Sequence, residues 1–168
     1  MQDRSYQPVA LPELPTYIDT EAQNRLKIMF KTATAKFRSL HQYQVYHVLK
    51  NPGQIVLNVA ATGSGKTLPY QLLMYTSAPP ATSLMVVPYN VLYGEMERRM
   101  KEVNITVGKY QRGQPFPQAK VVLVSLEVLG HGDELLQTLR QEDATGRLKC
   151  VVIDEARKWH HMYTWFNS

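Results

Sequence analysis

The sequence has little cysteine, no long apolar run and no dense block of one charge. Its 168 residues include a single cysteine, Cys150, so an internal disulfide is excluded and a reducing compartment is the natural setting. No apolar run approaches the roughly 18 residues that a transmembrane helix requires, so we expect none. The first residues lack the apolar segment of a secretory signal. We therefore expect a globular protein that is not secreted.

The remaining composition is that of an ordinary globular domain with a mild positive charge. Apolar residues make up 44% of the chain, charged residues 20%, and the net charge is +5. A positive balance is compatible with a polyanionic partner such as nucleic acid. Because the lysines and arginines are spread along the chain, a mildly basic solvated surface is the default interpretation of the charge, and the motifs must decide.

The chain divides into three stretches of different character. We expect residues 1–19, which contain three prolines and little periodicity, to be an extended or disordered lead-in. Residues 20–52 predict two helices, the first opened by a capping box at Thr20–Gln23 and the second covering 41–49. The apolar face expected for the first helix consists of Leu26, Met29, Phe30 and Ala33. Residues 53–168 form the third stretch.

This third stretch alternates between short apolar runs and helical patterns. The apolar runs lie at 55–59, 83–87, 105–108, 121–124 and 148–153. The helical patterns lie at 66–75, at 90–103 and around Leu135–Leu139. Near-continuous apolar runs separated by helices are typical of parallel strands that are covered on both faces. The sequence therefore predicts an α/β fold with a mainly parallel sheet flanked by helices, and ligands at the carboxyl ends of the strands.

The strongest motif is Ala60–Thr67, which fits the phosphate-loop pattern G-x-x-x-x-G-K-[ST] except that Ala60 replaces its first glycine. Glycines allow the backbone to turn its N–H groups onto phosphate oxygens, a lysine adds a point charge, and a threonine hydroxyl can bind Mg²⁺. We expect six residues to bind nucleotide here: Thr62, Gly63, Ser64, Gly65, Lys66 and Thr67. The alternative is a glycine turn that binds nothing.

A second motif ends the last apolar run with two acids, Asp154 and Glu155. A carboxylate at the end of a strand can hold Mg²⁺, and an adjacent acid can orient and deprotonate an attacking water. We expect Thr67 and Asp154 to bind the metal, and Lys66 and Glu155 to be catalytic. The alternative is a pair of solvated acids.

The two motifs together, A-x-T-G-S-G-K-T followed by D-E-A-x, resemble the signature of superfamily-two helicases. Further stretches resemble the RecQ-like branch of that superfamily, and the likeness covers roughly residues 36–157. In order along the chain these stretches are Phe37–Gln42, Gly65–Leu72, Val86–Leu92 and Val122–Glu127. The resemblance implies a RecA-like P-loop domain that is C-terminally incomplete, because no second helicase lobe follows.

The resemblance also implies roles for residues outside the phosphate loop. In the family motif that Phe37–Gln42 resembles, a glutamine binds the adenine, which assigns Arg38 and Gln42 to the nucleotide. Counted from Phe37 without a gap, the glutamine position falls on His41, so a shifted or lost adenine contact stays open.

The two later stretches resemble segments that contact DNA. This likeness assigns Pro88, Tyr89 and Ser125 to the nucleic acid, although Tyr89 replaces a usual leucine and Leu126 a usual proline. The aromatic-rich tail after Arg157 resembles a family loop that senses single-stranded DNA. A frayed apolar end is the alternative interpretation of this tail.

By resemblance, the chain is the ATP-binding lobe of an ATP-dependent 3′–5′ DNA helicase that uses ATP and Mg²⁺ and, in a eukaryotic cell, works in the nucleus. Arg157 stands where the family has a histidine that couples hydrolysis to movement, which favours an alternative: a degenerate fragment that binds nucleotide or DNA without turnover. A metabolic P-loop kinase is a third hypothesis.

Overall fold

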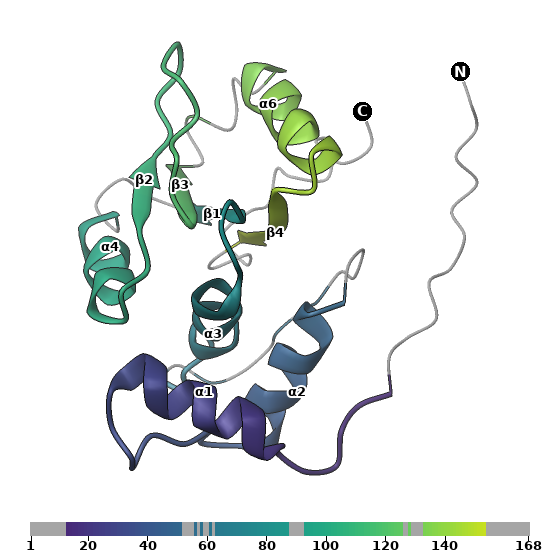
Figure 1. Cartoon of the computed structure of the whole chain (residues 1–168). Helices are drawn as coiled ribbons and strands as arrows, with labels where there is room; N and C mark the ends of the chain where they lie inside the picture. The colour runs from purple at the N-terminus through teal and green to yellow at the C-terminus, as the bar shows by residue number, and fades with distance from the viewer. Residues whose placement is uncertain are drawn as a thin grey trace. The chain divides into compact units, whose positions relative to one another are not determined.

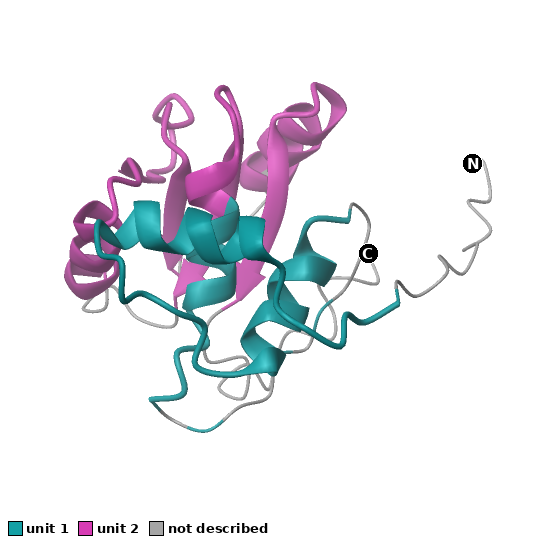
Figure 2. Ribbon diagram, turned by 60° about the horizontal axis from the view of Figure 1, so that its bottom comes forward, with its two compact units in different colours: residues 1–73 teal, residues 74–168 magenta. Residues whose placement is uncertain are grey.

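The computed structural model describes residues 13–51, 56, 58, 61, 63–87, 93–125, 128 and 133–153. The chain divides into two compact units, residues 1–73 and 74–168, coloured separately in Figure 2. Helix α3, Leu68–Thr76, begins in the first unit and ends in the second. None of the helices in the described ranges is long and apolar enough to cross a membrane.

The first unit contains helices α1, Thr20–Phe30, and α2, Leu40–Leu49 (Figure 1). Helix α1 buries Ala22, Leu26 and Met29, as its apolar spacing predicts. The expected face was wrong at its end, because Phe30 is 43% exposed and Ala33 is exposed. The cause is the left-handed conformation of Lys31, with φ 54°, which ends the helix before Ala33.

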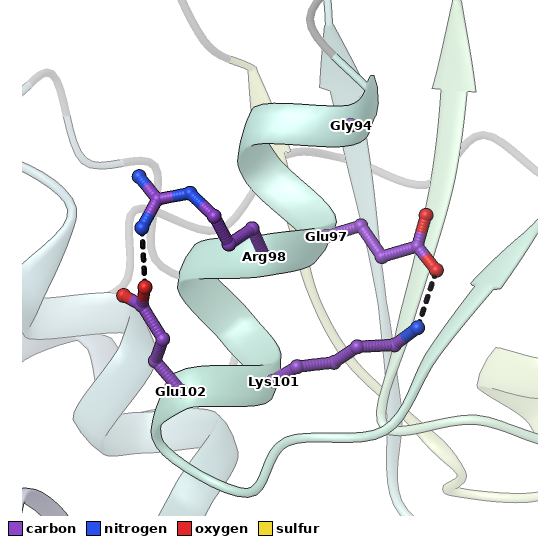
Figure 3. Close-up of a pocket in the computed structure, with 5 residues that line it drawn as sticks. All are labelled: Gly94, Glu97, Arg98, Lys101 and Glu102. Atoms are coloured by element: carbon purple, nitrogen blue, oxygen red, sulfur yellow. Dashed lines mark hydrogen bonds and ion pairs between the residues drawn. The ribbon is translucent and has the colours of Figure 1, made fainter.

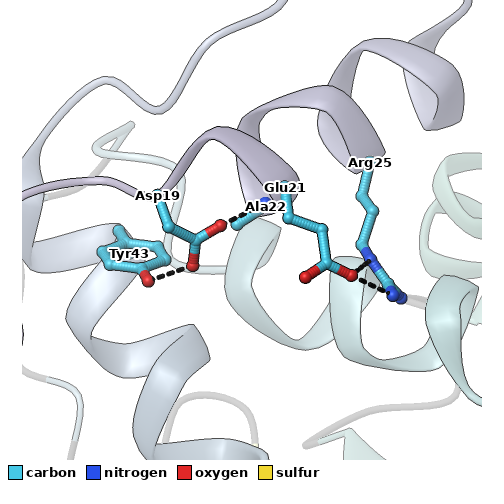
Figure 4. A network of polar contacts seen from close by, with 5 residues as sticks. All are labelled: Asp19, Glu21, Ala22, Arg25 and Tyr43. Atoms are coloured by element: carbon cyan, nitrogen blue, oxygen red, sulfur yellow. Dashed lines mark hydrogen bonds and ion pairs between the residues drawn. The ribbon is translucent and has the colours of Figure 1, made fainter.

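The N-terminus of α1 is capped by Asp19, not by the expected capping box at Thr20. An Asp19 carboxylate oxygen accepts a hydrogen bond of 2.6 Å from the Ala22 N–H, and the other accepts one from the Tyr43 hydroxyl (Figure 4). Gln23, expected to reach back to the cap, instead donates to the Ala35 carbonyl at 2.6 Å. A carboxylate at this position is the stronger cap because its charge also complements the positive end of the helix.

The Asp19–Tyr43 contact changes the ionisation of both groups. Burial raises the pKa of Asp19, but hydrogen bonds from Ala22 and Tyr43 and the charge of Lys50 outweigh it, so the pKa lies below its ordinary value. Burial, followed by the hydrogen bond to the Asp19 carboxylate, raises the pKa of Tyr43 to about 12. The pair therefore joins α1 to α2 as a carboxylate and a neutral phenol.

The second unit contains a parallel sheet whose described strands lie in the order β2-β3-β1-β4. Their bounds are Thr82–Val87 for β1, Val107–Lys109 for β2, Val121–Ser125 for β3 and Leu148–Ile153 for β4. This arrangement confirms the predicted parallel α/β fold. Of the strand expected at 55–59, Ile55, Leu57 and Val59 lie outside the described residues, and Val56 and Asn58 are not in a strand.

Burial in the sheet is highest in its two central strands. Every residue of β1 and β3 is buried, and alternate ones form a core with Leu135 of helix α6, Asp133–Ala144. Helix α4, Tyr93–Glu102, buries Met96 and Met100. Strand β4 lies at the edge of the described sheet and is only partly buried, with Val151 45% exposed, so the expected burial on both faces was wrong there.

The last turn of α3 is held by a lysine that directly precedes β3. The Lys120 ammonium donates to the carbonyls of Met74 and Tyr75 at 3.2 and 3.0 Å. Burial lowers the pKa of Lys120 from its ordinary value. A cation is stabilised at this place because the C-terminus of a helix carries unpaired carbonyls and partial negative charge.

Candidate nucleotide site

The phosphate loop turns sharply at two glycines. Gly63 and Gly65 both have φ of 77°, a left-handed conformation that side chains disfavour. The Ser64 N–H donates to the Ala61 carbonyl at 3.2 Å, and the Leu68 N–H donates to the Gly65 carbonyl at 3.0 Å. The two glycines in the motif are therefore required by the backbone itself. Thr62 lies outside the described residues.

Lys66 and Thr67 lie between this turn and helix α3. The Lys66 ammonium donates to the Ala61 carbonyl at 3.1 Å, which keeps it folded over the loop. The Thr67 carbonyl accepts from the Gln71 N–H at 3.1 Å. The helix begins at Leu68, two residues later than expected, because Lys66 and Thr67 still belong to the turn. The positive end of α3 is thus directed at the loop, as anion binding requires.

Helix α2 brings Gln42 against the loop from more than twenty residues earlier in the chain. The Gln42 amide nitrogen donates to the Ser64 and Gly65 carbonyls at 2.7 and 3.2 Å. The Gln42 amide oxygen accepts from the Arg38 N–H at 2.7 Å, and the residue is 4% exposed. The position of Gln42 is set by the cap of α2, where the Ser39 hydroxyl accepts from the Gln42 N–H at 3.3 Å.

Arg38 adds a third contact, since its guanidinium donates to the Gly63 carbonyl at 3.1 Å. Three consecutive loop carbonyls, those of Gly63, Ser64 and Gly65, are therefore held by two side chains. In a trans peptide unit the N–H points opposite to the C=O. The N–H groups of Gly65 and Lys66 consequently point away from Gln42, and main-chain N–H groups presented in this way suit phosphate oxygens.

The structure thus brings together, within one unit, seven of the residues expected at the nucleotide. They are Arg38, Gln42, Gly63, Ser64, Gly65, Lys66 and Thr67. Thr67 is the one expected Mg²⁺ ligand in the described ranges, whereas Asp154 and Glu155 lie outside them.

Of the residues expected at the nucleic acid, Pro88 and Tyr89 lie outside the described ranges. Ser125 ends strand β3 at 0% exposure. Its hydroxyl has no hydrogen-bond partner within the described part of the chain. A contact between Ser125 and nucleic acid stays a prediction.

Two polar contacts near the loop were not anticipated from the sequence. His41 shares a hydrogen bond of 3.0 Å with the Asn58 side chain, and the Ala61 carbonyl holds Lys66 as described above. The signal for the first was visible, because Asn58 is the one polar residue in the apolar run 55–59. The contact between Lys66 and the Ala61 carbonyl depends on the fold of the loop, and because its acceptor is a backbone group, no residue type in the sequence predicts it.

Charged side chains also line a hollow beside α4 (Figure 3). Its lining consists of Gly94, Glu97, Arg98, Lys101 and Glu102. Arg98 pairs with Glu102, and Lys101 pairs with Glu97 at 2.7 Å, each four residues apart on one helix. Because the charges compensate one another in solvent, this surface is a solvated helix face and not a ligand site.

Comparison with protein families agrees with the loop geometry. The family model for DEAD/DEAH box helicases matches residues 39–167, which is most of the chain. A comparison with curated proteins finds no significant match. DEAD/DEAH helicases use ATP, usually with Mg²⁺, and act on nucleic acid. The chain therefore belongs to the DEAD/DEAH box helicases, a family of superfamily two whose activity is ATP-dependent.

Proposed function

We propose that this chain is the ATP-binding lobe of a RecQ-like DNA helicase that moves 3′ to 5′. The observation that carries the proposal is the glycine turn of Gly63 and Gly65, held by Arg38 and Gln42 in front of α3. The RecQ-like assignment is supported by four sequence stretches in the family's order, which end before the D-E-A-R segment at Asp154–Arg157.

In this proposal the loop binds the triphosphate of ATP. The N–H groups of Gly65 and Lys66 face the phosphate oxygens, and the Lys66 ammonium exchanges the Ala61 carbonyl for the β and γ phosphates. The Thr67 hydroxyl and Asp154 would hold Mg²⁺, which would neutralise developing charge on the phosphates. Glu155 orients the attacking water.

DNA binds to the segments around Pro88, Tyr89 and Ser125, and strand separation requires a second lobe that works against this one. In a eukaryotic cell the site of action is the nucleus. The second candidate function is a nucleotide- or DNA-binding module without turnover. Arg157 favours it, because this arginine replaces the histidine of the motif that the segment resembles.

The test is the Mg-ATP affinity of the purified chain, measured by calorimetry beside Lys66→Ala. The ammonium supplies a point charge to the phosphates, so its removal is expected to weaken binding by about 100-fold or more. Lys50→Ala is the matched control, because it removes one exposed positive charge at the end of α2 and leaves the loop unchanged.

Equal Mg-ATP affinity of the parent chain and Lys66→Ala would contradict the assignment of the loop. Turnover that increases when single-stranded DNA is added supports the helicase lobe. Binding without any such turnover favours the second candidate function.

A further inference from the structure

Both N–H donors of the Gln42 side chain are already used by the protein. An amide side chain has two N–H donors and one carbonyl acceptor. In Gln42 the nitrogen donates to the Ser64 and Gly65 carbonyls at 2.7 and 3.2 Å, and the oxygen accepts from the Arg38 N–H at 2.7 Å. A glutamine that recognises adenine needs one donor and the acceptor directed at the base edge. Gln42, at 4% exposure, has both donors engaged with loop carbonyls, so it cannot make this two-point contact.

The polar neighbours of Gln42 are directed at protein atoms as well. The Arg38 guanidinium donates to the Gly63 carbonyl at 3.1 Å. His41, which falls on the glutamine position of the motif, shares its Nε2 hydrogen bond of 3.0 Å with Asn58. These contacts of Arg38 and His41, like those of Gln42, are therefore with protein atoms.

Close packing explains why Gln42 acts on the loop. A Cβ built on Gly65 would lie 2.6 Å from the Gln42 amide nitrogen, so this side chain is seated directly on the glycine. Its two hydrogen bonds fix the peptide units Ser64–Gly65 and Gly65–Lys66, whose N–H groups then point to the opposite side. Gln42 thereby sets the direction of the Gly65 and Lys66 N–H groups, which the proposed function places against the phosphates.

We propose that Gln42 is a positioning residue for the phosphate loop and that the site selects the triphosphate and not the base. The site would accept nucleoside triphosphates with any of the common bases. This inference rests on the proposed nucleotide function, because it concerns the same loop.

The first measurement compares Mg complexes of ATP, GTP, CTP and UTP on the whole chain by calorimetry. A bidentate contact to one base discriminates by roughly tenfold or more. Since no such contact remains, the four dissociation constants are expected to agree within about threefold. A preference for ATP of more than tenfold overturns the inference and leaves the proposed function standing. A folded chain that binds none of the four overturns both.

The second measurement uses Gln42→Glu, which places a carboxylate oxygen against the Ser64 and Gly65 carbonyls and removes both donors. Affinities for Mg-ATP, Mg-GTP and inorganic tripolyphosphate are expected to fall together, by about tenfold or more. Gln44→Glu is the control on the same helix, because Gln44 donates to the distant Pro15 carbonyl at 3.0 Å. Its affinities are expected to match those of the parent chain.

A base-reading glutamine gives the opposite pattern. In that case Gln42→Glu would lower the affinity for Mg-ATP alone and leave tripolyphosphate unchanged, which overturns the inference. Circular dichroism and thermal unfolding check that each variant is folded. If Gln42→Glu does not fold, the same affinities are measured with the uncharged variant Gln42→Met. The affinities for Mg-ATP, Mg-GTP and tripolyphosphate are again expected to fall by equal factors.

Discussion

Helices α1 and α3 begin in opposite ways. Asp19 directly precedes α1, and its carboxylate accepts a hydrogen bond of 2.6 Å from the Ala22 N–H. The chain itself therefore supplies an acceptor for an unpaired N–H group of this helix. The stretch Gly63–Thr67 directly precedes α3 and contains a lysine and no acidic residue. Every α-helix starts with unpaired N–H groups and partial positive charge. The comparison shows that the chain supplies an anion at the start of α1 and none in the stretch before α3, which supports the proposal that phosphates bind there.

The two ends of α3 differ in whether the chain supplies a side chain of opposite charge. Its C-terminal carbonyls of Met74 and Tyr75 are satisfied by the Lys120 ammonium, at 3.2 and 3.0 Å. The chain thus provides a cation for the negative end of the helix and no acidic side chain in the stretch before its positive end. An external anion, such as the phosphates of a nucleotide, complements that end.

Thr67→Asp should break this contrast and has the largest expected effect. It gives α3 an acid directly before its first residue, as Asp19 gives α1. Repulsion between the new carboxylate and the phosphates is expected to weaken Mg-ATP binding by about 100-fold or more. The thermal midpoint is expected to stay the same or rise, because the acid caps the helix.

Thr67→Ser keeps the hydroxyl and is the matched control, with affinity close to that of the parent chain in calorimetry. Undiminished Mg-ATP affinity of Thr67→Asp would show that the start of α3 does not face the phosphates.

Gly63→Ala and Gly65→Ala sharpen the comparison inside the loop. Both positions have φ of 77°, so an alanine at either costs about 1–2 kcal/mol of backbone strain. A Cβ on Gly63 meets nothing within 4 Å, whereas one on Gly65 lies 2.6 Å from the Gln42 amide nitrogen. We expect Gly65→Ala to weaken Mg-ATP binding about tenfold more than Gly63→Ala, since it also displaces Gln42. Similar dissociation constants for the two variants would contradict the role given to Gln42.

Asp19→Ala tests the structural end of the comparison and should affect stability without affecting the nucleotide. It removes the cap of α1 and leaves the Tyr43 hydroxyl, in a side chain 3% exposed, without its acceptor. The free energy of unfolding is expected to fall by about 2 kcal/mol in urea titrations. Asp19→Asn retains one acceptor oxygen and should lose less. A marked loss of Mg-ATP affinity in Asp19→Ala would show that α1 also serves the nucleotide site.

The same pair predicts how stability depends on pH. The pKa of Asp19 is lowered, so its contribution is present above the ordinary value of 3.8 and is lost as the pH falls through the folded value. The pKa of Tyr43 is raised from 10.0 to about 12, so its contribution is present below pH 10.0 and is lost as the pH rises toward 12. Tyr43→Phe should reduce the loss of unfolding free energy measured between pH 10.0 and pH 12, and the part that remains belongs to Tyr110, whose pKa is also raised by burial.

Patterns of neighbouring residues were sufficient for much of the fold. The apolar runs at 83–87, 121–124 and 148–153 are confirmed as parallel strands, because each run carries its own signal of burial. Element ends were less well predicted. Helix α1 begins at Thr20 as expected, but its cap was wrong, because Asp19 and not Thr20 caps it. The start of α3 was wrong because the glycine turn extends through Thr67.

By itself, the sequence determined the phosphate loop, its glycines and the α/β fold around it, because these depend on residues adjacent in the chain. Only the tertiary structure decided that Gln42 is held by the Ser64 and Gly65 carbonyls, since this contact spans more than twenty residues and depends on where the cap of α2 places the side chain. It also decided that β4 lies at the edge of the described sheet, because an apolar run does not reveal its neighbours.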